Sequence, residues 1–396
     1  MAKSNAFKLK KHSKIPKIYM DYGAGADANA SSVHTMGVEA KKILEKARGE
    51  VASVLHSRND EMIFTSGGTE GNNIAIQGLV LSLQNKKDSK ILPHVIITNI
   101  ELPSVLETCK MLEKRNMIQL SVVEVETNGI IDPKKIKKEL RNNTALVSVM
   151  YANNEIGTIQ PINEIAKEVR HFRKNKKIDS VFPLLHTDAV QAVNYLDLNV
   201  EKLGVDMLTL SGSKIKGAGR VGALFKKRTV DLVPVFYGGD QEMGLRPGTE
   251  NLTAISRFAK ALKNSQAQKQ KEGDRLKKLK NYFINKLSKI PLGGGVIING
   301  NTENSLPHMV SITFSKIPNE LLVIELSAKG VMCSSKSACK SSQKGGSYVI
   351  QAINPNLDPE IGAVRFSFGK DTKKEDIDYT IKVLKDILSK LKKWYS

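Results

Sequence analysis

Residues 62–70, MIFTSGGTE, pass from a short apolar strand into a turn of small residues, and the helical pattern of residues 71–83 follows. Further strand patterns continue as far as residue 225: 95–98, 120–125, 145–150, 184–187, 207–210 and 221–225. Helical patterns such as 103–115 and 162–174 lie between them. Strands that alternate with amphipathic helices form βαβ units, which build parallel sheets. The sequence therefore predicts an α/β fold with a mostly parallel, seven-stranded sheet.

The pattern changes after residue 251, where a Lys- and Gln-rich helical stretch runs to about residue 290. Strand patterns at 309–314 and 364–368 and a terminal helix follow a glycine-rich break at 293–295. The box Thr372-x-x-Glu375 is typical of a helix N-terminus and is expected to begin that last helix. We therefore predict three parts: a basic N-terminal arm (1–17), a large domain (18–255) and a smaller C-terminal α+β domain (256–396).

The chain is strongly basic, with 61 Lys and Arg against 40 Asp and Glu and a net charge of +21. The lysines are spread along helical stretches without interleaved aromatic residues, so we expect no specific nucleic-acid binding. Affinity for acidic proteins or non-specific binding of polyanions is the better interpretation. No stretch approaches the ~18 apolar residues of a membrane span, so no membrane association is expected.

The cysteine count and the N-terminus bear on the compartment. Three cysteines form neither a disulfide framework nor a zinc pattern, which favours a reducing compartment. The first twenty residues are lysine-rich but contain no arginine, so they resemble a mitochondrial presequence only weakly. We expect a cytoplasmic protein, and a mitochondrial one remains open.

Polar residues follow three of the predicted strands. Gly68 and Thr69 form a small-residue turn before a helix, which either binds an anion or is simply a turn. Asp188 ends the strand in HTDAVQ (186–191) and is either a helix cap or an ion-pair partner. Lys214 lies in LSGSKIKG (210–217) and is either exposed or, if buried, lowered in pKa as a Schiff-base amine requires. In such sheets ligands bind beyond the carboxyl ends of the strands, where all three clusters fall.

Taken together, the three clusters match the needs of one cofactor, pyridoxal 5′-phosphate (PLP). Its phosphate needs an anion cradle, its pyridine nitrogen needs a carboxylate, and its aldehyde carbon needs an amine. The sequence therefore predicts a PLP site built from these strand ends.

Ordered motifs over nearly the whole chain make the prediction more specific. They are IYMDY (18–22), FTSGGTE (64–70), NNEIG (153–157), HTDAVQ (186–191), SGSK (211–214), LRPGTEN (245–251), SSKSAC (334–339) and VRFS (364–367). With them the sequence resembles the cysteine desulfurases (NifS/IscS-like), within the class V aminotransferase group of fold-type-I PLP enzymes.

The resemblance implies a role for each matching residue. Lys214 would hold PLP as a Schiff base, Asp188 would pair with the pyridinium nitrogen, and Gln191 would bond the phenolic oxygen. Asn154 and Arg365 would bind the substrate carboxylate, and Asn154 would also contact the cofactor. The phosphate would be held by Gly68, Thr69, Ser211, Ser213 and, from the other subunit of a homodimer, Thr249.

The resemblance also implies the reaction and its partners. L-cysteine would become L-alanine, and its sulfur would form a persulfide on Cys339, for transfer to a sulfur-acceptor protein and iron–sulfur cluster assembly. Lys336 and Lys340 flank Cys339 in a polar stretch and should favour its thiolate. A buried, inert thiol is the alternative for Cys339, and it is the expected state of Cys109 and Cys333.

Four positions depart from the family pattern. Leu102 stands where the family has a histidine that stacks on the PLP ring, and Ser213 replaces the histidine before the Schiff-base lysine. Ala24-Gly25-Ala26 replaces Ala-Thr-Thr, and about a helix's worth of chain is missing near residues 27–32.

These departures leave two alternatives to a full desulfurase. One is a catalytically weak PLP-binding paralogue that acts as a scaffold. The other is a related PLP enzyme, such as a selenocysteine lyase, β-lyase or aminotransferase. A nucleophilic cysteine argues against the aminotransferase, which needs none.

Overall fold

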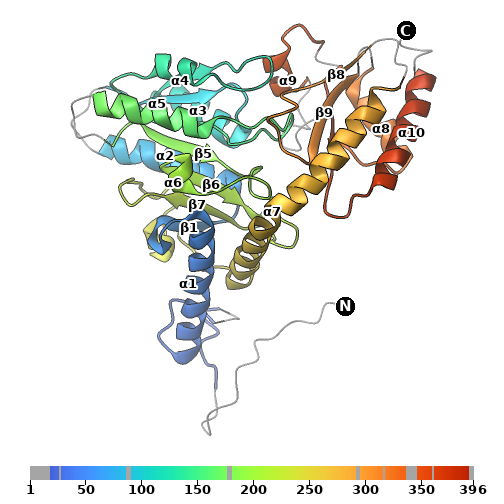
Figure 1. The fold of residues 1–396 in the computed structure, drawn as a ribbon. Coiled ribbons are helices and arrows are strands. Elements are labelled where there is room, and N and C mark those ends of the chain that lie inside the picture. Colours follow the sequence, from blue (N-terminus) through green and yellow to red (C-terminus); the bar gives the residue numbers. More distant parts are fainter. Residues whose placement is uncertain are drawn as a thin grey trace.

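A computed structural model describes residues 18–25, 28–85, 91–175, 181–290, 295–314, 317–335, 346–358 and 361–391. A central sheet with helices on both sides forms the larger part, and a smaller unit lies beside it (Figure 1). Helix α1 (Thr35–Leu55) projects away from the sheet, and α7 (Leu252–Leu287) runs from the sheet to the smaller unit.

The central sheet has seven strands in the order β1-β7-β6-β5-β4-β2-β3. The strands are β1 (Met62–Thr65), β2 (His94–Thr98), β3 (Gln119–Val123), β4 (Thr144–Ser148), β5 (Leu184–Asp188), β6 (Met207–Ser211) and β7 (Gly222–Lys226). Strands β3, β2, β4, β5 and β6 pair in parallel, whereas β7 is antiparallel to both neighbours. The prediction of a mostly parallel, seven-stranded sheet is confirmed.

Helices cover the sheet because its strands are apolar on both faces. Strands β1, β2, β4, β5 and β6 are buried along their whole length, as expected for parallel strands between helical layers. The helices that follow strands of this sheet are α2 (Gly68–Asn85), α3 (Pro103–Lys114), α4 (Pro133–Glu139), α5 (Ile162–Asn175) and α6 (Val200–Leu203). The large unit also has the short turns η1 (Asn59–Glu61), η2 (Gly212–Lys214) and η3 (Gln241–Gly244).

The smaller unit packs around a three-stranded antiparallel sheet in the order β10-β9-β8. Its elements are β8 (Val296–Ile298), β9 (Met309–Phe314), β10 (Val364–Ser367), α8 (Asn319–Ala328) and α10 (Lys374–Leu391), whereas α9 (Tyr348–Ile353) packs on the core of the large unit. Helix α7 buries Phe258 and Leu262 in the core of the large unit, and Leu276 and Phe283 in the core of the small one. The proposed boundary between residues 255 and 256 therefore falls inside this helix.

The predicted capping box of the last helix is wrong by one residue. Helix α10 begins at Lys374, and the Lys373 N–H donates to the carboxylate of Asp376 (2.8 Å). The Thr372 hydroxyl instead accepts from the Gly369 N–H (2.9 Å). The loop before the helix uses Thr372, so Asp376 takes the place expected for Glu375.

The buried side chain of His186 should make the folded protein less stable in mild acid. The ring nitrogens of His186 lie 2.8 Å from Ser148 Oγ and 3.0 Å from Thr209 Oγ1, and burial lowers its pKa to about 3. As the pH falls, the unfolded chain protonates this histidine near pH 6.5, whereas the folded chain does so only near pH 3. The contribution of neutral His186 to the free energy of unfolding is therefore present above pH 6.5 and is lost as the pH falls below it. At pH 5 the loss is about 2 kcal/mol for one such histidine. Urea unfolding of His186→Gln should show a weaker pH dependence between pH 7 and 5 than wild type; an equal dependence would contradict this prediction.

Candidate active site

The predicted anion cradle joins β1 to α2 and needs its glycine. A Cβ atom added to Gly68 would lie 2.7 Å from Cγ2 of Val190, so no larger residue fits without displacing the chain. Ser211 lies next to the turn, within 3.8 Å of a Cβ atom added to Gly68, and its hydroxyl is 2.9 Å from that of Ser213. Thr69 and Ser213 are exposed. The fold therefore brings Gly68 and Ser211 together at the carboxyl edge of the sheet.

Asp188 ends β5 and is 2% exposed. One carboxylate oxygen accepts from the Val190 N–H (2.9 Å), and the other accepts from the Asn72 side-chain amide (2.7 Å). Burial raises the pKa of Asp188, although these hydrogen bonds and the nearby charge of Lys214 oppose the rise. Asp188 thus closes a local turn, and it is also a buried acid that a cationic ligand nitrogen would stabilise.

Asn72 was not predicted from the sequence, yet it positions Asp188. It lies on α2, is fully buried, and also donates to Ser104 Oγ (2.9 Å). Its own amide oxygen is buried without a hydrogen-bond partner among the described residues. A polar residue on the buried side of the helix that follows the cradle was the only signal for it.

Lys214 ends the short turn η2 and is exposed in the single chain. Its carbonyl accepts from the Asn194 side-chain amide (2.6 Å), which holds the turn in place. Lys214 and Gln191 line the same cleft, of about 830 Å³, between the sheet edge, α7 and the smaller unit. The fold therefore places both residues where the sequence predicts a cofactor.

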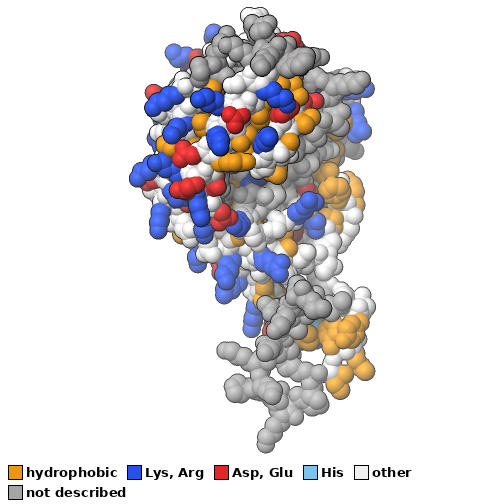
Figure 2. All heavy atoms as spheres, turned by 90° about the vertical axis from the view of Figure 1, so that its right-hand side faces the viewer, with side chains coloured by type: hydrophobic (Ala, Val, Ile, Leu, Met, Phe, Trp, Pro, Cys, Tyr) orange, Lys and Arg blue, Asp and Glu red, His pale blue; other side chains and the backbone are white. Residues whose placement is uncertain are grey.

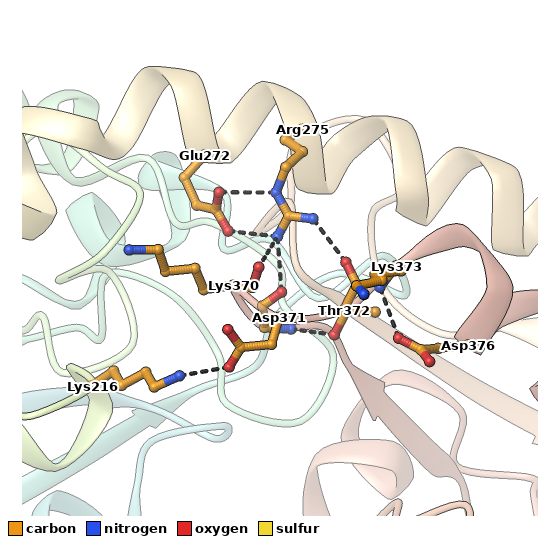
Figure 3. A network of polar contacts seen from close by, with 9 residues as sticks. Lys216, Glu272, Arg275, Lys370, Asp371, Thr372, Lys373 and Asp376 are labelled. Carbon is orange, nitrogen blue, oxygen red and sulfur yellow. Dashed lines mark hydrogen bonds and ion pairs between the residues drawn. The ribbon is translucent and has the colours of Figure 1, made fainter.

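A network of polar contacts forms the outer rim of this cleft (Figure 3). Lys216, next to the Lys214 turn, pairs with Asp371 of the small unit (2.5 Å). On α7, Arg275 pairs with Glu272 (2.7 Å) and donates to the carbonyls of the loop before α10: Gly369, Lys370 and Thr372. These contacts link the Lys214 turn to the small unit.

Arg365 and Asn154 come together although they lie on different units. Arg365, on β10, donates to the backbone carbonyl of Asn154 (2.8 Å). The Nε of Arg365 and the side-chain oxygen of Asn154 are both buried without a partner among the described residues. Burial lowers the pKa of Arg365, and Glu155 partly offsets this. A buried donor and acceptor left free in this way indicate a polar ligand.

Leu102 is the N-cap residue of α3, with no side-chain cap, and packs against the large core. The neighbouring Glu101 is fully buried and accepts from the Met150 N–H (3.0 Å) and the Thr98 hydroxyl (2.6 Å). Burial raises the pKa of Glu101 to about 8. Position 102 therefore offers an apolar surface and no group that exchanges protons.

The cysteines divide into core and undescribed residues. Cys109 is buried and Cys333 is half-buried, and burial raises the pKa of both thiols, that of Cys333 to about 11. The prediction of a core thiol is confirmed for Cys109, whereas Cys333 only packs, half-buried, against the edge of the smaller core. Cys339, with Lys336 and Lys340, lies outside the described residues.

The described residues also bear on two other kinds of function. No helix in that part of the chain is long and apolar enough to cross a membrane. Within the same ranges, no group of three or more His, Cys, Asp or Glu side chains could hold a metal ion.

Comparison with known proteins places the chain in a family. Residues 10–380 match the family described as aminotransferase class-V. The cysteine desulfurase IscS of Dictyoglomus turgidum is 39% identical over 92% of this chain and 88% of its own length. Cysteine desulfurase IscS 1 of Archaeoglobus fulgidus is 36% identical over 92% of this chain and 90% of its own.

Solved structures agree with this assignment. A NifS-like protein matches with a TM-score of 0.81 at 32% identity, covering 92% of each chain. A NifS-like protein from Rickettsia africae matches with a TM-score of 0.78 at 28% identity, again covering 92% of each chain. Both the sequence and the fold thus match over nearly the full length, and this chain belongs to the cysteine desulfurase group of the class V aminotransferase family, whose members depend on PLP.

Proposed function

We propose that this protein is a PLP-dependent cysteine desulfurase, which converts L-cysteine to L-alanine and leaves the sulfur as a persulfide on Cys339. The observation that carries the proposal is the convergence of three strand ends: the Gly68 turn, the buried Asp188 and the Lys214 turn lie at one edge of the sheet. A sulfur-acceptor protein would take the persulfide, and we propose that it does so in the cytoplasm.

The residues present fit PLP. The Gly68 turn, Thr69, Ser211 and Ser213 would hold its phosphate, and Asp188 would hold its ring nitrogen protonated. Gln191 would bond its phenolic oxygen, and Lys214 would bind it covalently. When bound, PLP supplies an electron sink for the bond changes at the substrate Cα. The free atoms of Arg365 and Asn154 support binding of the substrate carboxylate beside it.

The test combines spectroscopy with two product assays on the purified protein. With L-cysteine, the proposal expects alanine and a persulfide in equal first-turnover amounts, and a change in visible absorbance. Cys339→Ser should abolish the persulfide without removing the absorbance, whereas Cys333→Ser should do neither. Pyruvate, ammonia and sulfide in place of alanine and persulfide would favour a β-lyase. Visible absorbance without either product would favour a PLP-binding scaffold protein. The observation that supports this second function is the absence of a proton-transfer group at Leu102.

We predict that Asp188→Ala weakens PLP binding. A charge-assisted hydrogen bond contributes about 1.5–3 kcal/mol, so affinity should fall at least roughly tenfold. Equilibrium dialysis of the apoprotein with PLP measures this, and Asp197→Ala, at a half-exposed aspartate, is the control. Unchanged affinity in Asp188→Ala would reduce Asp188 to a turn-closing residue.

We also propose that the protein is a homodimer in which Thr249 completes the phosphate site of the other subunit. Large apolar side chains are exposed on the N-terminal segment (Ile18, Met20, Tyr22, Val33) and on the η3 loop (Phe236, Tyr237, Met243). Figure 2 shows hydrophobic side chains gathered at the narrow lower end of the molecule. A clustered apolar surface of this kind favours a protein interface.

Glu250, next to Thr249, gives independent support for the dimer. One of its carboxylate oxygens is buried and has no hydrogen-bond partner within the described part of the chain. Light scattering should give twice the 43.6 kDa chain mass, and a PLP-loaded monomer would reject the dimer.

A further inference from the structure

We propose that residues 236–251, called here the η3 arm, form a rigid segment that presents Thr249 to the partner subunit. The ion pair Arg246–Glu70 fixes this arm to the phosphate cradle of its own subunit. Arg246 is then a positioning residue that acts on the partner's cofactor, whereas Glu70 bonds both the arm and the backbone of its own cradle. The inference rests on the proposed homodimer, which it extends by naming what positions the shared phosphate ligand.

The first anchor of the η3 arm is a buried ion pair. Glu242 accepts from both terminal nitrogens of Arg48 on α1, at 2.7 and 2.8 Å, and from the Phe64 N–H of β1 at 2.7 Å. Both side chains of the pair are almost fully buried. The arm is therefore tied to the strand that leads into the cradle.

The backbone at this anchor is strained, which indicates that the surroundings fix it. Glu242 and Met243 both have positive φ angles, 47° and 60°, which residues with a side chain rarely adopt. Such conformations persist where neighbouring contacts over-determine them, and they cluster at functional positions. Here the contact is the carboxylate of Glu242.

The second anchor joins the η3 arm to the cradle itself. Arg246 Nε donates to Glu70 Oε1 at 2.9 Å, and the other oxygen of Glu70 accepts from the Ser66 N–H at 2.5 Å. Burial opposes ionisation of Glu70, but the hydrogen bonds from Ser66 and Arg246 outweigh it and hold its pKa below the usual value. Glu70 directly follows Thr69, so one carboxylate bonds both the cradle backbone and the arm.

The segment between Arg246 and Thr249 has little freedom. Pro247 fixes its own φ, and the Gly248 N–H donates to the Gln241 side chain at 3.0 Å. Gly248 has a φ of 100°, which only glycine adopts readily. Thr249, which is exposed, is thus held at a set position relative to the Arg246–Glu70 pair.

This geometry predicts that a substitution of Arg246 affects PLP binding in the partner subunit (in trans) and not in the subunit that carries it (in cis). Loss of Arg246 frees the arm, so the partner subunit loses the fixed Thr249 hydroxyl. The subunit that carries the substitution keeps its own Gly68 turn, Thr69 and Ser211. Of the two ion pairs, Arg246–Glu70 is the better one to disrupt, because the Arg246 side chain is 28% exposed. Removing Arg48 would instead leave the charge of Glu242 buried and unpaired, which would destabilise the fold.

The experiment uses hybrid dimers of two differently tagged full-length chains. One subunit carries Lys214→Ala and cannot bind PLP covalently, so borohydride reduction and mass spectrometry report PLP on the other subunit alone. When Arg246→Gln is added to the Lys214→Ala subunit, the PLP affinity of the unsubstituted partner should fall about tenfold. When Arg246→Gln is placed instead on the reporting subunit, its affinity should stay within about twofold of the unsubstituted hybrid.

Further variants keep the result interpretable. Glu70→Gln retains an oxygen for the Ser66 N–H but loses the ion pair, so it should reproduce the loss in trans. Arg246→Lys should lose less than Arg246→Gln. Arg228→Gln, which removes a comparable exposed pair with Asp60 (2.6 Å), should change neither subunit.

Three results would overturn the proposal: a loss only in cis, no loss in either arrangement, or dissociation of the Arg246→Gln hybrid into monomers. The last would assign Arg246 to the interface. A wild-type chain that is itself monomeric would reject the homodimer, which distinguishes failure of the proposed function from failure of the arm.

Discussion

Lys214→Ala protein is expected to be colourless after desalting and to release no alanine from L-cysteine above the background of free PLP. Two described amines on the turn between β6 and β7, those of Lys214 and Lys216, line the cleft that also contains Gln191. Without Lys214 the cofactor has no covalent attachment, and the visible absorbance of the Schiff base between this lysine and PLP is lost. Absorbance after gel filtration and borohydride trapping measure the outcome.

Lys216→Ala is the matched control for Lys214→Ala. Lys216 lines the same cleft two residues further on, but its ammonium pairs with Asp371 at the rim. It should retain colour and covalent trapping. A Lys214→Ala protein that still gave a borohydride-trapped PLP adduct would sink the assignment of Lys214.

Leu102→His is expected to raise the rate of alanine release by up to about a hundredfold. General acid–base catalysis by a positioned side chain is typically worth about 10²–10⁴-fold, and Leu102 cannot transfer a proton. The neighbouring Glu101 does not substitute for it, because its carboxyl is fully buried and engaged by Met150 and Thr98. Steady-state alanine release across pH 5–9 measures the gain, and the histidine should add a titration near pH 6.5.

Leu102→Asn separates catalysis from helix stability. Position 102 is an N-cap, where asparagine stabilises the helix but exchanges no proton near neutral pH. It should not raise the rate. No gain in Leu102→His would indicate that the missing N-terminal segment has reshaped the pocket, and the scaffold function would then be favoured. A wild-type rate equal to that of ordinary family members would show that another group, such as Lys214, already moves the proton.

The sequence predicted the sheet well because strand and helix patterns are local. The seven strand patterns differ from the observed strands only at their ends, as for residues 145–150 against Thr144–Ser148. Helix α1 was missed, although its leucines and alanines pack on the large core, because its charged residues obscure the apolar face. The misplaced capping box has a local origin too, since Thr372 accepts from the Gly369 N–H in the preceding loop and leaves the cap to Asp376, which accepts from the Lys373 N–H.

The candidate site was predicted in part for a related reason. Asp188 ends a strand, and Gly68 and Lys214 each lie three residues beyond one. Because the carboxyl ends of parallel strands meet at one edge, their neighbourhood follows from topology alone. Their roles, and that of Cys339 outside the described residues, came from resemblance to a family rather than from the pattern.

What the sequence by itself determined is therefore the seven strands of the large sheet, the glycine turn of the cradle and the family. Only the tertiary structure decided which side chains support the site: Asn72 on Asp188, Arg365 on the Asn154 carbonyl, and Arg246 on Glu70. These pairs are separated by 116, 211 and 176 positions in the chain. Contacts at that distance leave no periodic trace in a sequence, because they depend on how whole elements pack and not on the residues beside them.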